Sequence, residues 1–198
     1  MTLLYLPGCP KEQVMFVVQH PLKYKHMTSE TLDKASLFSS LDEAASQLHQ
    51  LMAPLDESKF NVIPYPDSWT AGMLYRHIAK VIDNITRALQ QPSKPAGREA
   101  DEKVPELKKI FLDFSTKMKS PDIAIPEEGV YQKQDVLDKL QASVSRFKET
   151  AANQDGNELV TGLRVGDATK LELLHFVLYH TQRHLNQMRK IVDALHNK

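Results

Sequence analysis

The sequence predicts an all-α protein: a four-helix bundle with one extra short helix. Apolar residues recur every three or four positions in five segments, which is the spacing of the buried face of an α-helix. The chain contains only 7 glycines, and no segment shows the sustained two-residue alternation of a half-buried strand. Clusters of proline, glycine, serine and asparagine separate the segments, as turns between helices require.

Four of these segments are long and one is short. Their apolar stripes cover residues 37–55, 74–89, 107–118, 137–151 and 171–195, of which 107–118 is the short one. A single short strand is expected between residues 157 and 162, where two turn-forming clusters enclose a few residues. The connection that contains the short segment is long, so the helices are not expected to alternate in direction through short loops alone.

The ends of the expected helices carry recognisable signals. Asp67 or Ser68 can cap the second segment, because both side chains accept hydrogen bonds from backbone N–H groups. Pro105 suits the first turn of the short segment, where a backbone N–H is not needed. Thr169 and Glu172 precede the last stripe with the three-residue spacing of a capping box.

The bundle pattern covers residues 27–198, whereas residues 1–26 do not follow it. The apolar run 14–18 has the composition of a strand but no evident partner. Either these 26 residues are an extension that precedes a start at Met27, or they form an arm packed on the bundle. The sequence leaves both interpretations open.

Composition excludes several classes of function. Lys+Arg 25 balance Asp+Glu 25, so no overall field favours nucleic acid or an anionic membrane. No apolar run approaches the roughly 18 residues that span a bilayer. Pro7 interrupts the first apolar run, which also lacks the basic start of an export signal. The single cysteine, Cys9, excludes an internal disulfide, and we expect a cytoplasmic protein.

Two histidines in the last expected helix have the spacing of metal ligands. Four residues advance an α-helix by about 400°, so the rings of His180 and His184 lie roughly 40° apart on one face. They interrupt an otherwise mostly apolar line, formed by Leu173, Val177, His180, His184, Gln187 and Ile191. A buried imidazole needs partners for its nitrogens, and a metal ion together with an outer acceptor would satisfy both of them.

The second expected helix offers a third histidine on a comparable face. His77 lies on the line of Thr70, Met73, His77 and Asn84, beside an apolar stripe. Three neutral nitrogen ligands leave coordination positions open, which is the layout of a catalytic metal site. The alternative is that histidines four residues apart occur by chance among 8 histidines, and that His77 is a core or capping residue.

The other histidines are interpreted as surface or packing residues: His20, His26, His49, His175 and His196. His175 lies about 140° around the helix from His180, so it is not expected to join the same site.

Five further side chains are candidates for a functional role. Trp69 is interpreted mainly as a packing anchor, with a substrate platform as the alternative. Asp113 is either a general base or, more in keeping with its position, a solvated or capping carboxylate. Gln187 lies one turn beyond His184 and either orients it or packs. Arg183 points about 100° away from the neighbouring ligand, and Cys9 lies outside the bundle, which argues against a cysteine nucleophile.

These residues resemble a known family. Residues 68–72 (SWTAG) followed by 75–77 (YRH) resemble the second-helix motif of the DinB-like, or DinB/YfiT-like, metalloenzyme superfamily. Residues 166–172 (GDATKLE), then 180–184 (HTQRH) and Gln187, resemble its last-helix motif. Both motifs occur in the expected order and spacing.

The resemblance covers roughly residues 30–196. It implies a four-helix bundle that holds zinc, nickel or another divalent ion on His77, His180 and His184. Some members of this superfamily transfer a low-molecular-weight thiol, such as bacillithiol or mycothiol, onto electrophiles. Others act as isomerases or are called hydrolases.

Two hypotheses about function follow. The first is a metal-dependent transferase or hydrolase acting on a small molecule, with a thiol or water as the nucleophile. The second is a non-catalytic bundle that binds a metal or a small ligand. Neither hypothesis involves nucleic acid or a membrane. The resemblance and the broad apolar surface of the last helix together lead us to expect a homodimer.

Overall fold

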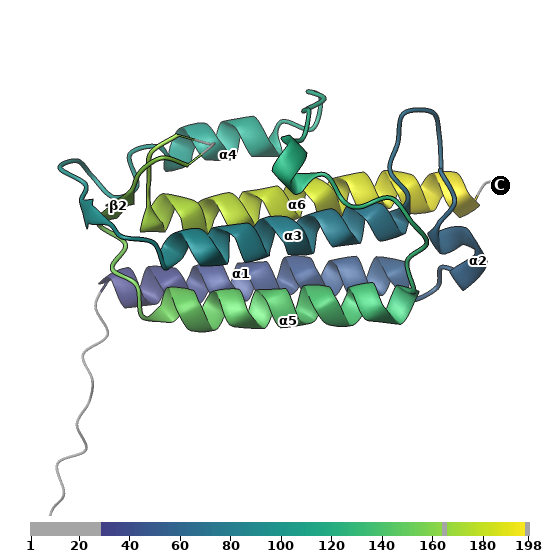
Figure 1. The fold of residues 1–198 in the computed structure, drawn as a ribbon, viewed down its shortest axis with the longest axis horizontal. Helices are drawn as coiled ribbons and strands as arrows, with labels where there is room; N and C mark the ends of the chain where they lie inside the picture. The colour runs from purple at the N-terminus through teal and green to yellow at the C-terminus, as the bar shows by residue number, and fades with distance from the viewer. Residues whose placement is uncertain (1–28, 164–165, 197–198) are drawn as a thin grey trace, which may run out of the picture.

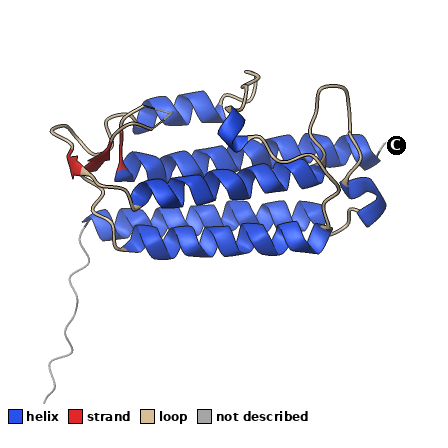
Figure 2. Ribbon diagram, viewed as in Figure 1, coloured by secondary structure: helices blue, strands red, loops and turns tan. Residues whose placement is uncertain are grey.

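A computed structural model describes residues 29–163 and 166–196, which form the expected four-helix bundle (Figures 1 and 2). The long helices are α1 (Ser29–Met52), α3 (Ala71–Leu89), α5 (Lys133–Ala152) and α6 (Lys170–His196). The short ones are α2 (Glu57–Phe60), α4 (Val104–Leu112) and the 3-10 turn η1 (Asp122–Ala124). The expected fold class is confirmed. The expectations for residues 1–26, including the run 14–18 and Cys9, lie outside the described residues.

The bundle has two diagonal pairs of helices. Both α1 and α3 pack on α5 and on α6, so α1 and α3 lie across the core from each other. Helices α1 and α6 run in one direction, and α3 and α5 run in the other (Figure 1). Because α3 and α5 are parallel, the connection between them must return along the whole bundle. That connection contains α4, which packs on α6, and η1, which contacts α3.

The core is formed by the apolar stripes that define the helices. Leu41 and Leu48 of α1, Ile78 of α3, Leu140 of α5 and Val177 of α6 are all fully buried. Burying one such side chain stabilises the fold by about 1.5–3 kcal/mol relative to leaving it exposed. The apolar faces therefore supply most of the stability that holds the helices together.

A small antiparallel sheet closes the end of the bundle where α3 ends and α6 begins (Figure 2). Its order is β1 (Lys94–Pro95), β2 (Glu158–Val160) and β3 (Ala168–Thr169), with Leu159 paired to Lys94 on one side and to Thr169 on the other. Strand β2 is the one expected from the sequence. The strands β1 and β3 have only two residues each, which is too short to show a periodic pattern.

The capping box at the start of α6 is confirmed. Thr169 Oγ1 accepts from the backbone N–H of Glu172 over 3.1 Å, and the Glu172 carboxylate accepts from the N–H of Thr169 over 2.9 Å. The same carboxylate accepts two hydrogen bonds from the guanidinium of Arg98 and one from the N–H of Lys103. The box therefore also attaches the connection before α4 to the start of α6.

Two helix ends differ from the sequence expectation. Thr70, rather than Asp67 or Ser68, caps α3, because its Oγ1 accepts from the N–H of Met73 over 3.1 Å. Asp67 instead adopts a left-handed backbone conformation with φ of 57° in the preceding turn, so it is not placed to cap the helix.

Helix α4 ends at Leu112, although the apolar stripe that predicted it extends six residues further, to Met118. The carboxylate of Asp113 accepts from the N–H and hydroxyl of Ser115 and from the hydroxyl of Thr116. These local bonds replace the next helical turn. The apolar residues beyond it, Phe114 and Met118, are consequently exposed.

The apolar surface of α6 is covered within one chain. Leu174, Leu178, Leu185 and Val192 are all buried, since α1, α3 and α4 pack around this helix. The apolar stripe of α6, on which the prediction of a homodimer partly rested, is therefore buried by helices of the same chain. The homodimer stays a prediction. Among the described helices, none is long and apolar enough to cross a membrane.

Candidate metal centre

His77 of α3 and His180 and His184 of α6 converge in the core of the bundle. Their Nε2 atoms form a triangle with sides of 3.0 Å between His77 and His184, and 3.1 Å for each of the other two pairs. The three residues are 2%, 6% and 8% exposed, respectively. The structure thus brings together the three residues selected from the sequence, and they form a group that could hold a metal ion.

The other ring nitrogens fix the protonation of two of these histidines. His77 Nδ1 lies 2.7 Å from the carbonyl oxygen of Ala124, and His184 Nδ1 lies 2.8 Å from Oε1 of Gln187. Both oxygens only accept, so both Nδ1 atoms carry the proton. The Nε2 atoms of His77 and His184 therefore present lone pairs towards each other.

These facing lone pairs fit a cation better than a hydrogen-bonded network. No proton lies between the Nε2 atoms of His77 and His184, and their 3.0 Å separation is repulsive unless a positive charge lies nearby. Tetrahedral ligands about 2.0–2.1 Å from zinc lie about 3.3 Å apart, close to the distances in this triangle. His180 Nδ1 is buried without a hydrogen-bond partner among the described residues.

Burial keeps all three imidazoles neutral. Removal from water lowers the pKa of His77, and it lowers the pKa of His180 well below its ordinary value, with His184 and His77 adding to the effect. Burial, followed by the repulsion that two protonated rings would exert on each other at His77 and His184, lowers the pKa of His184 to about 3. The neutral imidazole is the form that binds a metal.

Aromatic side chains wall the triangle. The ring of Trp69 lies 4.8 Å from that of His77, centroid to centroid. The ring of Phe176 stacks on His180 at 5.6 Å, and Phe111 lies 6.2 Å from the same histidine. These rings exclude water and lower the local dielectric, which strengthens electrostatic interactions within the site.

The segment 111–127, which we call the strap, is attached to both helices that carry the histidines. The guanidinium of Arg183 on α6 donates to the carbonyl oxygens of Phe111, Asp113 and Thr116, the first two over 3.2 Å and 2.8 Å. Three carbonyls held by one side chain fix the beginning of the strap against α6.

The other end of the strap is attached to α3. Besides the bond from His77 to Ala124, Lys80 donates to the carbonyl of Ile125 and to the carboxylate of Glu127, each over 2.9 Å. Arg76 shares that carboxylate at 3.2 Å. Lys80 and Arg76 lower the pKa of Glu127 to about 2, through hydrogen bonds that outweigh its desolvation.

The remaining sequence candidates have structural roles. Asp113 terminates α4, as the capping interpretation expects, and Arg183 points to the strap rather than to the triangle. Gln187 bonds to His184, which supports its orienting role. Trp69 packs on the core and also touches His77. The ring of His175 contacts that of Tyr179 at a tilt of 34°, and His175 is not part of the three-histidine group.

Three features of the site were not predicted. The Ala124 carbonyl has no sequence signal, because every residue carries one. The contact of Phe111 depends on how α4 folds back on α6. Phe176 was detectable, since it precedes His180 by four residues and so shares its face of the helix.

The fold and the three converging imidazoles define a helical bundle with a candidate metal centre. The sequence model of the DinB superfamily matches residues 40–188, and the chain belongs to that superfamily. It is 24% identical over 165 residues to the uncharacterized protein YuaE of Bacillus subtilis (strain 168), covering 79% of this chain and 98% of the relative. No solved structure gives a significant match.

Proposed function

We propose that this protein is a metal-dependent enzyme in which His77, His180 and His184 hold one divalent ion, such as zinc or nickel. The observation that carries the proposal is the triangle of Nε2 atoms, two of them with lone pairs fixed by outer acceptors. A bound ion would lower the pKa of a thiol or water ligand and so supply a nucleophile near neutral pH.

The protein's own groups support this chemistry in three ways. The acceptors Ala124 and Gln187 fix the orientation of two imidazoles, so that little reorganisation is needed when a metal binds. The aromatic wall of Trp69, Phe111 and Phe176 keeps the site dry. Three histidines leave at least one coordination position for a substrate, which a closed four-ligand site would not.

The reaction that we favour is transfer of a low-molecular-weight thiol to a small electrophile, with hydrolysis as the alternative nucleophilic reaction. The preference for a thiol rests on membership of the superfamily, which is an argument by analogy. The apolar, aromatic surroundings also suit a polarisable sulfur more readily than a strongly hydrated nucleophile.

A second candidate is a metal-stabilised bundle without catalytic activity. The burial of the three histidines favours it, because none is more than 8% exposed. In this case the ion would contribute only to stability, through binding to the folded state. The two candidates differ in whether an external thiol or anion reaches the metal.

The experiment begins with untagged protein, since a histidine tag would bring its own metal. Elemental analysis should give one divalent ion per chain, and cobalt substitution provides a visible spectrum that reports on the ligands. Adding a thiol such as cysteine or mercaptoethanol should change that spectrum if the metal is open to substrate. An unchanged cobalt spectrum at saturating thiol and azide would support the non-catalytic candidate, and absence of metal binding would exclude both.

A further inference from the structure

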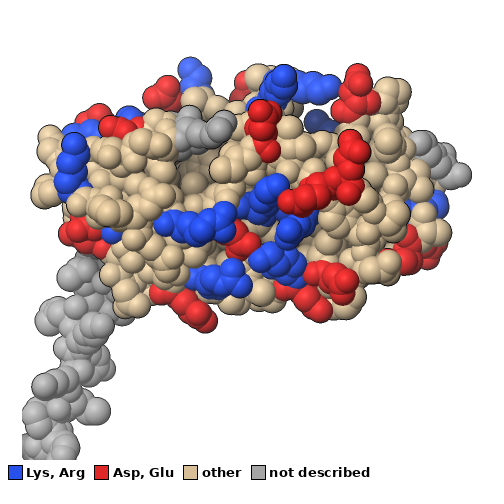
Figure 3. Space-filling model, viewed as in Figure 1, with Lys and Arg blue, Asp and Glu red and all other residues tan. Residues whose placement is uncertain are grey.

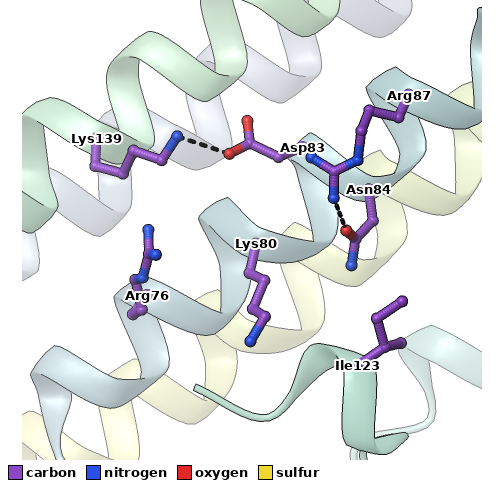
Figure 4. Close-up of a pocket in the computed structure, with 7 residues that line it drawn as sticks. All are labelled: Arg76, Lys80, Asp83, Asn84, Arg87, Ile123 and Lys139. Carbon is purple, nitrogen blue, oxygen red and sulfur yellow. Dashed lines mark hydrogen bonds and ion pairs between the residues drawn. The ribbon is translucent and has the colours of Figure 1, made fainter. Parts of the chain in front are cut away.

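A second polar feature lies on the outer surface of α3, away from the histidine triangle. A hollow of about 290 Å³ is lined by residues of α3, α5 and η1, and we call it the basic hollow. Arg76, Lys80 and Arg87 lie four and seven residues apart on α3 and so share one face, and Lys139 of α5 completes the rim (Figure 4). Lys and Arg side chains gather across the middle of this face of the molecule (Figure 3).

The carboxylates around the basic hollow do not neutralise these cations. Asp83 is shared between Lys139 at 2.7 Å and Arg146 at 3.3 Å. Glu127 is likewise shared between Arg76 and Lys80, at 3.2 Å and 2.9 Å. Each carboxylate thus serves two cations, although Lys+Arg and Asp+Glu are equal in number in the whole chain.

Arg87 adds to the excess of positive charge. Its guanidinium donates to the amide oxygen of Asn84, and none of the described carboxylates pairs with it. Four cations, Arg76, Lys80, Arg87 and Lys139, line the hollow, and the carboxylates that pair with them are Asp83 and Glu127, so the excess is two positive charges. The side chains of Lys80, Arg76 and Lys139 are between 26% and 33% exposed, so their charges are partly shielded from water and act more strongly than fully solvated ones.

We propose that the basic hollow is a binding site for the phosphate group of a small molecule or for free phosphate. Arg76 and Arg87 supply planar guanidinium donors that match phosphate oxygens, and Lys80 and Lys139 add point charges. The size of the hollow suits one such group. The Glu127 carboxylate accepts hydrogen bonds from Arg76 and Lys80. A phosphate must therefore compete with this carboxylate for both side chains.

The test is titration of the full-length protein with inorganic phosphate and, separately, with glycerol phosphate, by calorimetry or phosphorus NMR at low ionic strength. Saturable binding of both ligands would identify the site as one for a small phosphate ester. Binding of inorganic phosphate alone would identify it as a site for the free ion. Affinity should fall as salt is added, because the cations are partly exposed.

Variants decide whether the basic hollow is responsible. Arg87→Gln should weaken binding by about tenfold, the loss expected for one charge-assisted contact, whereas Glu127→Gln should strengthen it by removing the competing carboxylate. Arg189→Gln is the matched control: Arg189 also donates to an amide, that of Gln47, and lines a separate hollow of about 380 Å³ without another cation. This variant should bind as the wild type does.

Three results would overturn the proposal. The first is absence of saturable binding in protein whose circular dichroism shows it folded. The second is an equal loss in Arg87→Gln and Arg189→Gln, which would indicate general charge attraction. The third is binding that requires metal-loaded protein, which would make phosphate a ligand of the metal instead. Titrating metal-free and metal-loaded samples in parallel separates this last case, so the proposal stands or falls independently of the metal centre.

Discussion

The carbonyl oxygen of Ala124 accepts the Nδ1–H of His77 over 2.7 Å, although 47 positions separate the two residues in the chain. This bond directs the Nε2 lone pair of His77 towards the imidazoles of α6. The next residue, Ile125, is held by Lys80, one turn further along α3. The strap and His77 are therefore positioned together, and a displacement of the strap should change the orientation of His77 at the metal centre.

Replacing any one of the three histidines should abolish tight metal binding. His77→Ala, His180→Ala and His184→Ala each leave only two imidazoles, and affinity should fall by orders of magnitude. The bundle should remain folded, because a small side chain relieves the lone-pair contact, and the cost in unfolding free energy should be a few kcal/mol at most. Elemental analysis of untagged protein measures the metal, and thermal unfolding with and without zinc measures the stability.

His175→Ala is the matched control for these variants. His175 is in the same helix as two of the ligands and is partly buried, but its ring contacts Tyr179 and it is not part of the three-histidine group. This variant should keep its metal. Equal metal content in all four variants would exclude the histidine triangle as the binding site.

The sequence predicted the bundle and the triangle because both depend on helical periodicity. Apolar spacing located the long helices, and a helix rotates by a fixed angle per residue, so the common face of His180 and His184 follows directly. Placing His77 opposite them also required the order and spacing of the second-helix and last-helix motifs. Helical periodicity and motif spacing can both be read directly from the sequence.

The parts that were not predicted depend on long-range contacts. The stripe through Met118 has helical spacing, yet α4 ends at Leu112, because Asp113 forms local bonds and Arg183 takes the carbonyls of the following turn. The partner of Arg183 is a backbone group 70 positions away. Periodicity contains no information about such a partner.

Gln187→Ala should weaken metal binding without removing a ligand. Gln187 accepts the Nδ1–H of His184 and thereby holds its lone pair towards the other two imidazoles. Loss of such an outer acceptor typically costs 10–100-fold in metal affinity, so we expect a loss of about that size. Competition with a chromophoric zinc chelator measures the affinity.

Two companion variants separate orientation from packing. Gln187→Glu keeps an acceptor for His184 and should retain most of the affinity that the alanine variant loses. Asn186→Ala changes the neighbouring partly buried amide and should behave as the wild type. If the Glu and Ala variants lost affinity equally, the hydrogen bond to His184 would not be the cause.

Arg183→Met should loosen the strap while leaving the bundle intact. The methionine keeps much of the apolar stem of the side chain but removes the donors that hold the carbonyls of Phe111, Asp113 and Thr116. We expect amide hydrogen exchange to speed up within 111–127, with a loss of about 1–2 kcal/mol in global stability. Arg189→Met is the control, since Arg189 is exposed and donates to Gln47, remote from the strap. Unchanged exchange in Arg183→Met would show that the strap is held by other contacts.

Glu172→Gln should destabilise the protein near neutral pH. The Glu172 side chain is fully buried and accepts two hydrogen bonds from Arg98 and one each from the N–H groups of Lys103 and Thr169. The amide of glutamine would bring an N–H group into this cluster of donors and leave Arg98 with only the more distant carboxylate of Glu102, at 3.9 Å, as its counter-charge. The loss in unfolding free energy should be about 2 kcal/mol, measured by urea unfolding at pH 7.

The same residue makes a prediction about pH. Burial opposes ionisation of Glu172, but the hydrogen bonds from Arg98, Thr169 and Lys103 outweigh it and lower the pKa below its ordinary value. A carboxylate with a lowered pKa stabilises the folded state fully above its unfolded-state pKa of about 4.3. This contribution is lost as the pH falls through the lower, folded-state value. The difference in stability between the wild type and Glu172→Gln should therefore be constant from pH 7 to about pH 5 and shrink below about pH 4.

Other acid-labile groups, including the buried histidines, are common to both proteins and cancel in the difference. The exposed Glu106 provides the control, since Glu106→Gln should follow the wild type over the whole range. A difference between wild type and Glu172→Gln that stayed constant down to pH 3 would mean that the ionised carboxylate is not what stabilises the start of α6.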